Sequence, residues 1–180
     1  MSGTINHTKS GMTFRKIINE NGIDYSLVSI GTRTKFNFVF YGVGFYSDKP
    51  EYYVGDSLIT EKSFGSDDTN LLVFRFYRKV TRDRMMEAFR EAIETRVGEG
   101  YCPEEIEKFE TLLGGIDQLN YEDTLQFNFL DGLTIYYNNK LLGSIKDRKF
   151  MKVLFSVFMD SNSVTPDIKN RYKYYKFIFL

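Results

Sequence analysis

The most constraining feature of this chain is a run of alternating side chains between residues 31 and 46. Its sequence, GTRTKFNFVFYGVGFY, puts Phe36, Phe38 and Phe40 in one row and begins the other row at Arg33. Alternation with period two is typical of a strand that has one face in an apolar core. An arginine at the edge of such a core requires an anion or a carbonyl oxygen, because its charge cannot be buried alone. That anion is either a protein carboxylate or a ligand.

The length of the chain predicts a single globular domain. Its 180 residues are 42% hydrophobic, which is enough to build one sizeable core. Residues 1–11 are mostly polar and contain His7, the only histidine. We therefore expect a flexible N-terminal tail over residues 1–11 and one domain over residues 12–180.

Composition also excludes several classes of function. The 24 basic residues balance the 24 acidic ones, so no basic footprint for nucleic acid exists. No run of 18 apolar residues is present to span a membrane, and no targeting signal is visible. We expect a soluble protein of the cytoplasm or an organelle stroma. With one histidine and one cysteine, and without a phosphate or dinucleotide loop, we expect no metal, no cofactor and no histidine-dependent catalytic site.

The order of the periodic segments predicts the fold class. We expect strands at residues 23–33, 35–46, 71–78, 125–129, 133–137 and 141–145, with short strand-like pieces such as 52–54. Apolar residues at helical spacing predict helices at 82–97, at 103–113, after Asp147, and from Thr165 onward. Several strands, two helices, a three-strand meander and two helices together indicate an α+β domain. Its large antiparallel sheet is covered by helices on one face.

Six short motifs in this order resemble those of the chalcone isomerase-like family. They are GTRTK at 31–35, FYGVGFY at 40–46, LVFRFYRKV at 72–80, GLTI at 132–135, GSI at 143–145 and SVTPDIK at 163–169. Each motif is weak by itself, but together they extend over roughly residues 12–170. The resemblance implies an open-faced β-sandwich, which agrees with the predicted order of elements.

The resemblance also implies a choice between two kinds of function. The family includes plant isomerases that close a flavanone ring, fatty-acid-binding proteins and non-catalytic homologues. The isomerases carry a tyrosine and an asparagine around the first long helix, whereas residues 78–100 here contain neither. The fatty-acid-binding branch is more similar, which implies that the chain is not an enzyme. An isomerase-type intramolecular lyase and an interaction scaffold without a ligand are the alternatives.

The residues implied in ligand binding are Arg33 and Tyr41, which match an arginine and a tyrosine that hold a carboxylate in the fatty-acid-binding branch. An arginine supplies a planar fork of donors, and a tyrosine hydroxyl adds a neutral donor. The predicted ligand is a fatty acid or a similar amphipathic carboxylate. The expected walls for its tail are Phe36, Phe38, Phe40, Met85, Phe89 and Leu154.

The unbroken alternation conflicts with this pairing. One straight strand would separate Arg33 from Tyr41 by roughly 26 Å at about 3.3 Å per residue, too far to share a carboxylate. A reversal near Asn37 would instead bring the two side chains opposite each other. The pattern itself favours continuity from Lys35 to Tyr41.

Overall fold

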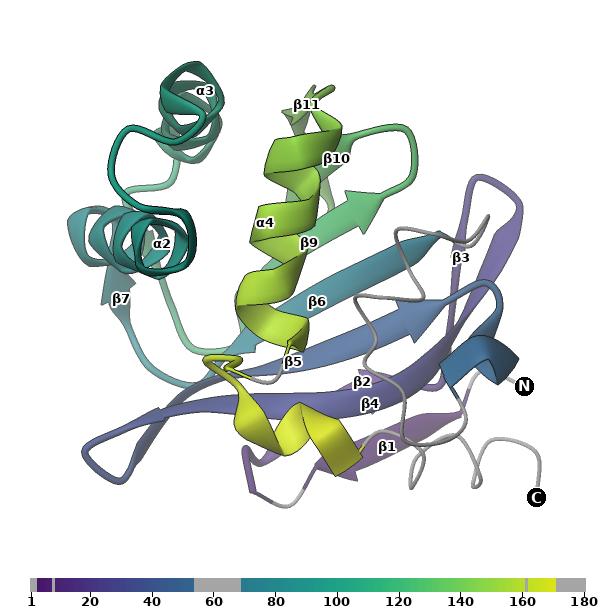
Figure 1. The fold of residues 1–180 in the computed structure, drawn as a ribbon. Helices are drawn as coiled ribbons and strands as arrows, with labels where there is room; N and C mark the ends of the chain where they lie inside the picture. Colours follow the sequence, from purple (N-terminus) through teal and green to yellow (C-terminus); the bar gives the residue numbers. More distant parts are fainter. Residues whose placement is uncertain (1–2, 8, 54–68, 161, 171–180) are drawn as a thin grey trace.

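The large antiparallel sheet predicted from the sequence is present. The computed structural model describes residues 3–7, 9–53, 69–160 and 162–170 (Figure 1). Every neighbouring pair in the seven-stranded sheet is antiparallel. In spatial order the strands are β11 (Lys140–Ile145), β10 (Leu133–Tyr137), β9 (Thr124–Phe129), β6 (Asn70–Phe76), β5 (Phe38–Ser47), β4 (Ile23–Lys35) and β3 (Ile17–Glu20).

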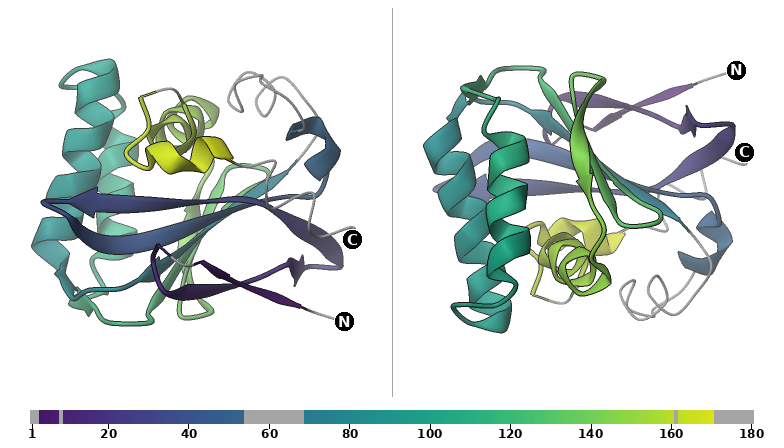
Figure 2. Two further views of the ribbon diagram at one scale, coloured as in Figure 1. Left: turned by 90° about the horizontal axis from the view of Figure 1, so that it is seen from below. Right: turned by 90° about the horizontal axis from the view of Figure 1, so that it is seen from above.

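The helices cover one face of this sheet, as expected (Figure 2). They are α2 (Arg82–Val97), α3 (Pro103–Leu113) and α4 (Arg148–Met159). The predicted bounds of α2 and α3 are confirmed, and α4 begins directly after Asp147. That carboxylate accepts the Phe150 N–H at 2.7 Å and so caps the helix. Within the described ranges, no helix has the length and apolar character that a membrane span requires.

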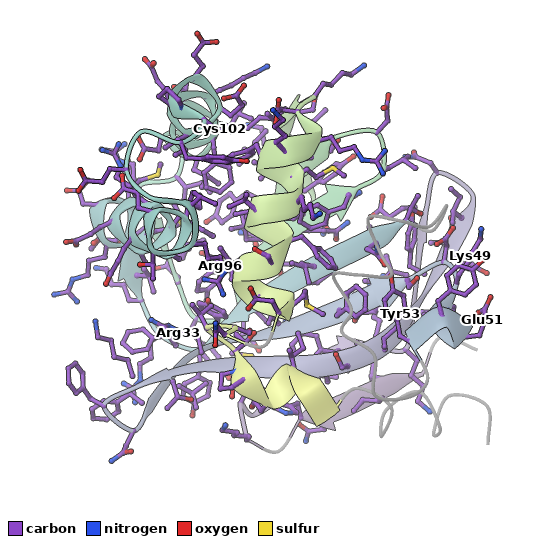
Figure 3. All side chains as sticks on the ribbon, in the orientation of Figure 1. Arg33, Lys49, Glu51, Tyr53, Arg96 and Cys102 are labelled. Carbon is purple, nitrogen blue, oxygen red and sulfur yellow. The ribbon has the colours of Figure 1, made fainter. Side chains whose placement is uncertain are left out.

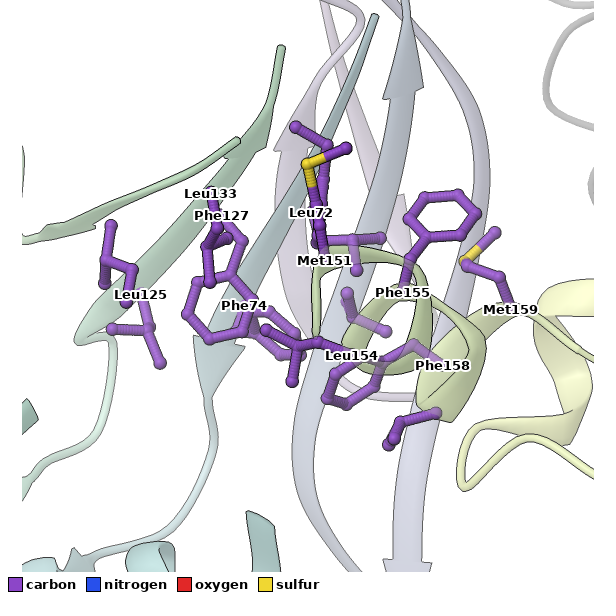
Figure 4. Close-up of a cluster of buried hydrophobic side chains, with 14 of the residues drawn as sticks. Leu72, Phe74, Leu125, Phe127, Leu133, Met151, Leu154, Phe155, Phe158 and Met159 are labelled. Carbon is purple, nitrogen blue, oxygen red and sulfur yellow. The ribbon is translucent and has the colours of Figure 1, made fainter. Parts of the chain in front are cut away.

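The main core lies between the sheet and α4 (Figure 4). Phe74 on β6 is central to it, with ring centroids 5.1 Å from Phe127 and 4.9 Å from Phe158. Edge-to-face packing of this kind adds stability beyond the area that the rings bury. Leu154 and Phe155 of α4 are fully buried in the same layer. Helix α4 is therefore fixed firmly on the sheet.

The opposite face of the sheet carries a second, smaller core that the sequence did not predict. Strand β1 (Thr4–His7) pairs with β2 (Met12–Arg15), and the hairpin lies on the far side from the helices (Figure 2). Residues 4–7 thus form a strand where we expected a tail. The reason is that Met12 and Phe14 are buried against the sheet and hold the hairpin there. His7 is only 7% exposed, and its Nδ1 lies 2.9 Å from Ser10 Oγ.

The expected single strand from Lys35 to Tyr41 is wrong. Phe36 and Asn37 have positive φ angles of 51° and 62°, and they form a two-residue turn between β4 and β5. Two consecutive residues with positive φ are typical of a tight hairpin whose twist matches that of its strands. Arg33 and Tyr41 therefore lie on adjacent antiparallel strands.

Two smaller expectations need correction. Residues 52 and 53 of the expected strand-like piece belong instead to a short 3-10 helix, η1 (Pro50–Tyr53), in which the fixed φ of Pro50 suits the first position, and residue 54 lies outside the described residues. The last predicted helix is a 3-10 segment, η2 (Pro166–Asn170). Two further short strands, β7 (Val80–Thr81) and β8 (Gln118–Leu119), pair beside α2. Residues 171–180, which include three tyrosines and two phenylalanines, lie outside the described residues.

Candidate functional site

The β4–β5 hairpin brings Arg33 and Tyr41 together. They are direct cross-strand partners, and an extra residue on β5, Phe40, forms a bulge next to them. Residues opposite each other on antiparallel strands project their side chains from the same face of the sheet. Tyr41 packs on the main core, so this face is the one that carries the helices. The two donors implied by the family resemblance are therefore adjacent.

Tyr41 presents its hydroxyl beside an aromatic wall. Its ring lies 5.5 Å from Phe74 and 5.4 Å from Phe76, centroid to centroid, and the residue is half-buried. Burial raises the pKa of Tyr41, and the nearby positive charge of Arg33 offsets this only in part. The hydroxyl is therefore protonated at neutral pH. It has no hydrogen-bond partner among the described residues, so it is free to donate to a ligand.

Arg33 is held less firmly than a structural arginine would be. Its only hydrogen bond within the described ranges runs from Nη1 to the carbonyl oxygen of Val164, at 3.5 Å. No described carboxylate lies within ion-pair distance of it, in contrast to the ion pairs of Arg90 and Arg96. The described part of the chain thus offers no protein anion for Arg33. Most of its guanidinium donors are available to a ligand.

The segment after α4 lies between Arg33 and a second arginine, Arg96 of α2 (Figure 3). Arg96 Nη2 donates to the carbonyl oxygen of Asn162 at 2.8 Å and to Asp160 Oδ1 at 3.1 Å. Its side chain is only 13% exposed, and its charge is already matched by Asp160. The two arginines therefore differ in role. Arg96 ties α2 to the end of α4, whereas Arg33 has no carboxylate partner among the described residues.

The six expected pocket residues separate into three sets. Met85, Phe89 and Leu154 do come together in the main core, where the Phe89 ring lies 6.2 Å from that of Phe158. Phe36 and Phe38 do not join them, because the turn carries both to the end of the hairpin, where they are 82% and 52% exposed. These two side chains do not line the layer between sheet and helices. Phe40 is half-buried at the bulge.

Sequence reasoning missed the contacts that place η2 beside Arg33. Asp167 accepts the Thr32 N–H at 2.7 Å and also the Thr32 hydroxyl, and it pairs with Lys9 at 3.0 Å. Gly31 permits this approach, since a Cβ there would lie 2.9 Å from carbons of Thr165 and Ile168. The TPD sequence at 165–167 was visible as a helix start. Its partner Thr32, 135 positions away, carried no local signal.

A seven-stranded antiparallel sheet with helices on one face is an open-faced β-sandwich of the α+β class. The chain belongs to the chalcone isomerase-like family, whose model matches residues 6–171. Among solved structures it is similar to a fatty-acid-binding protein of Arabidopsis thaliana. That similarity has a TM-score of 0.76 at 14% identity and covers 99% of this chain and 100% of the other. No curated protein matches the chain.

Proposed function

We propose that this protein binds a fatty acid or a similar amphipathic carboxylate without transforming it. The observation that carries the proposal is the cross-strand pair of Arg33 and Tyr41. The Tyr41 hydroxyl and the Arg33 donors other than the Nη1 that contacts Val164 have no described protein acceptor, and both residues lie beside an apolar layer. A carboxylate accepts bonds from a guanidinium and a hydroxyl at once, and hydrogen bonds of this charge-assisted kind are the strong ones. The similarity to a protein named as fatty-acid-binding supports the same ligand class.

In this proposal, the tail of the ligand extends from Tyr41 between the sheet and helices α2 and α4. Met85, Phe89 and Leu154 are the wall residues of the sequence-based set that lie in the main core. Helix α2 is the element that yields, because it buries only Met85 and Ile93 while α4 buries seven residues. Elements with few buried apolar contacts open at low cost in free energy. An acyl chain therefore enters by displacing α2 rather than α4.

The absence of catalysis is part of the proposal. Helix α2 lacks the tyrosine and asparagine of the isomerases, and its exposed positions there hold residues such as Asp83, Arg84, Arg90 and Glu91. Arg90 is already engaged by Glu110, with Nη2 2.7 Å from Oε2. We expect no ring closure above background when a hydroxylated chalcone is added. Stereoselective formation of a flavanone would favour the isomerase-type lyase instead.

The test is calorimetric titration of a long-chain fatty acid into wild-type protein and three variants. Arg33→Ala should weaken binding by about 1.5–3 kcal/mol, the range for a hydrogen bond to a charged group. Tyr41→Phe removes only a neutral donor and should weaken binding by about 1 kcal/mol. Arg84→Ala is the matched control, because it removes an exposed arginine for which no contact within the described residues is recorded.

Three results would count against a carboxylate clamp. The first is wild-type protein that binds no fatty acid, either in solution or as a retained ligand in native mass spectrometry. The second is an Arg33→Ala variant that loses stability in urea by as much as it loses affinity, which would make Arg33 a structural residue. The third is a methyl ester that binds as tightly as the free acid. That result would show that burial of the tail, and not recognition of the carboxylate, supplies the affinity.

A further inference from the structure

The tip of the β4–β5 hairpin, residues 35–38, exposes two aromatic rings away from the rest of the fold. Strand β5 pairs with β6 only from Tyr41 onward, and β4 pairs with β3 only as far as Ser26. The tip therefore extends beyond the sheet (Figure 1). Phe36 there is 82% exposed and Phe38 is 52% exposed.

Phenylalanine is an unexpected choice at this turn. Positions with positive φ in two-residue hairpins favour asparagine, aspartate and glycine, yet Phe36 has a φ of 51°. The turn geometry therefore does not require the ring, and the Phe36 side chain belongs to neither core of the described residues. A large apolar side chain that is both conformationally costly and exposed indicates a contact outside the folded chain.

Basic side chains that have no carboxylate partner among the described residues lie beside the tip. We use the term basic cluster for Lys35, Arg78 and Lys79, which are all exposed and have no carboxylate partner among the described residues. Lys35 Nζ lies 5.7 Å from the Phe36 ring centroid, and Arg78 Cζ lies 4.6 Å from that of Phe38. Segments 33–38 and 77–84 contain six basic residues and one acidic residue in a chain of zero net charge. The rest of the molecule is therefore net acidic.

We propose that this hairpin tip docks on an anionic lipid surface. Phenylalanine rings insert at the boundary between headgroups and acyl chains, while the basic cluster attracts lipid phosphates and carboxylates. The shape favours a membrane over a protein partner. A stable protein interface buries about 800 Å² on each side, whereas a narrow tip with two exposed rings is suited to shallow insertion.

The proposal goes beyond ligand binding and is tested without a fatty acid. It has one consequence for the candidate site, because Arg33 and Tyr41 lie on the same two strands directly behind the tip. Docking would bring them close to the lipid surface. If Arg33 binds no carboxylate, the docking surface is unaffected, so the two proposals fail separately.

The experiment is flotation of the purified protein with vesicles of phosphatidylcholine, with and without phosphatidylserine. We expect wild-type protein to bind the vesicles that contain phosphatidylserine, and Phe36→Ser combined with Phe38→Ser to lower the partition constant at least about tenfold. Each neutralisation in the basic cluster, such as Lys35→Gln or Arg78→Gln, should lower it about fivefold on anionic vesicles only. Leu130→Ser combined with Leu141→Ser is the matched control, since both leucines are 57% exposed and lie outside the tip.

The variants should keep the wild-type circular dichroism spectrum and urea unfolding midpoint, because the altered side chains lie outside both cores. Wild-type protein that does not float with anionic vesicles would overturn the proposal. Equal loss of binding in the tip and control variants would do the same. The alternative occupant of the tip is a second copy of this chain, and sedimentation velocity tests it. If the wild-type protein is a dimer and the Phe36→Ser and Phe38→Ser changes dissociate it, the tip is a contact between copies. That result would also overturn membrane docking.

Discussion

At the scale of single residues, Asp167 shows how one carboxylate positions a distant segment. It accepts the N–H and hydroxyl of Thr32 and pairs with Lys9 from the opposite face of the sheet. Burial by itself would raise the pKa of Asp167, but the hydrogen bonds from Thr32 and Lys9 outweigh it and hold the pKa below its usual value. The ionised carboxylate is thus the form that stabilises the fold.

Asp167→Asn should destabilise the protein by about 2 kcal/mol at neutral pH, since the neutral amide replaces an anion that accepts three hydrogen bonds. The folded pKa is lowered, so the stabilising contribution is full above the unfolded pKa of about 4 and is lost as pH falls through the folded value. The difference between wild type and variant should therefore be constant above about pH 5 and shrink below about pH 4. Urea unfolding over a series of pH values measures this difference in the free energy of unfolding between the two proteins.

The control for this prediction is Asp117→Asn, because the Asp117 side chain is 94% exposed and its ion pair with Arg82 is 3.6 Å long. It should change stability very little at any pH. A wild-type advantage over Asp167→Asn that stays constant down to strongly acidic pH would show that the carboxylate charge is not what Thr32 and Lys9 recognise.

Single residues also mark the limit of what the sequence could predict about the site. Arg33 was identifiable because a charge in an apolar row must be compensated. Tyr41 was assigned to the site through the family resemblance. The Val164 carbonyl, which receives the only described hydrogen bond of Arg33, lies 131 positions away. No period or local pattern encodes such a pairing, so only the folded chain reveals it.

At the scale of elements, periodicity predicted helices better than reversals. Helix α2 and the meander of β9, β10 and β11 follow apolar spacings that continue over the whole element. The turn at Phe36 and Asn37 was hidden because phenylalanines on both sides of Asn37 extend the alternation through it. The exposed rings thus imitate a buried strand. Alternating phenylalanines that are exposed and alternating phenylalanines that are buried in a core cannot be told apart from the sequence.

The attachment of α2 leads to a prediction about Arg96. Arg96→Ala removes the bonds to Asp160 and to the carbonyl oxygens of Asn162 and Val157, and it leaves a partly buried carboxylate without its cation. We expect a loss of roughly 2–3 kcal/mol in the free energy of unfolding. Hydrogen exchange should accelerate most in α2, because α4 keeps its own buried side chains. The measurements are urea unfolding and peptide-level exchange by mass spectrometry.

Arg84→Ala is again the comparison, since it removes an exposed arginine from the same helix and should leave both measurements unchanged. If Arg96→Ala instead accelerated exchange uniformly over the molecule, the helix would not be a separately opening element. The proposed path for the ligand beside α2 would then lose its support.

At the scale of the whole molecule, the sheet has a core on each face, and the sequence predicted only one. The core under the helices follows from helical and strand periods that agree with each other. The core under β1 and β2 depends on two buried side chains, Met12 and Phe14, in a mostly polar stretch. Its partners include Tyr46 and Leu71, on the face of the sheet away from the helices. A short hairpin that adds few apolar residues carries too weak a pattern to be detected alone.

The layered architecture predicts how affinity depends on the length of the ligand. If the tail lies between sheet and helices, each added methylene should strengthen binding by about 0.8 kcal/mol, or roughly fourfold, until the space is filled. Beyond that length the affinity should level off or fall. Titration of saturated fatty acids of increasing length against one preparation measures this. Affinity that is independent of chain length would place the tail in solvent and restrict recognition to the carboxylate.

The part of β4 that follows Ser26 is an edge of the sheet, to which a strand from another chain could be added. Past Ser26 its outer side has no strand partner in the described part of the chain, and η2 covers this border, with Asp167 taking the N–H of Thr32. An uncovered border of unpaired N–H and C=O groups recruits strands from other molecules. The contact that places η2 beside Arg33 thus also acts as a safeguard against aggregation. Lasting detachment of η2 would leave this border open to strand addition by another chain.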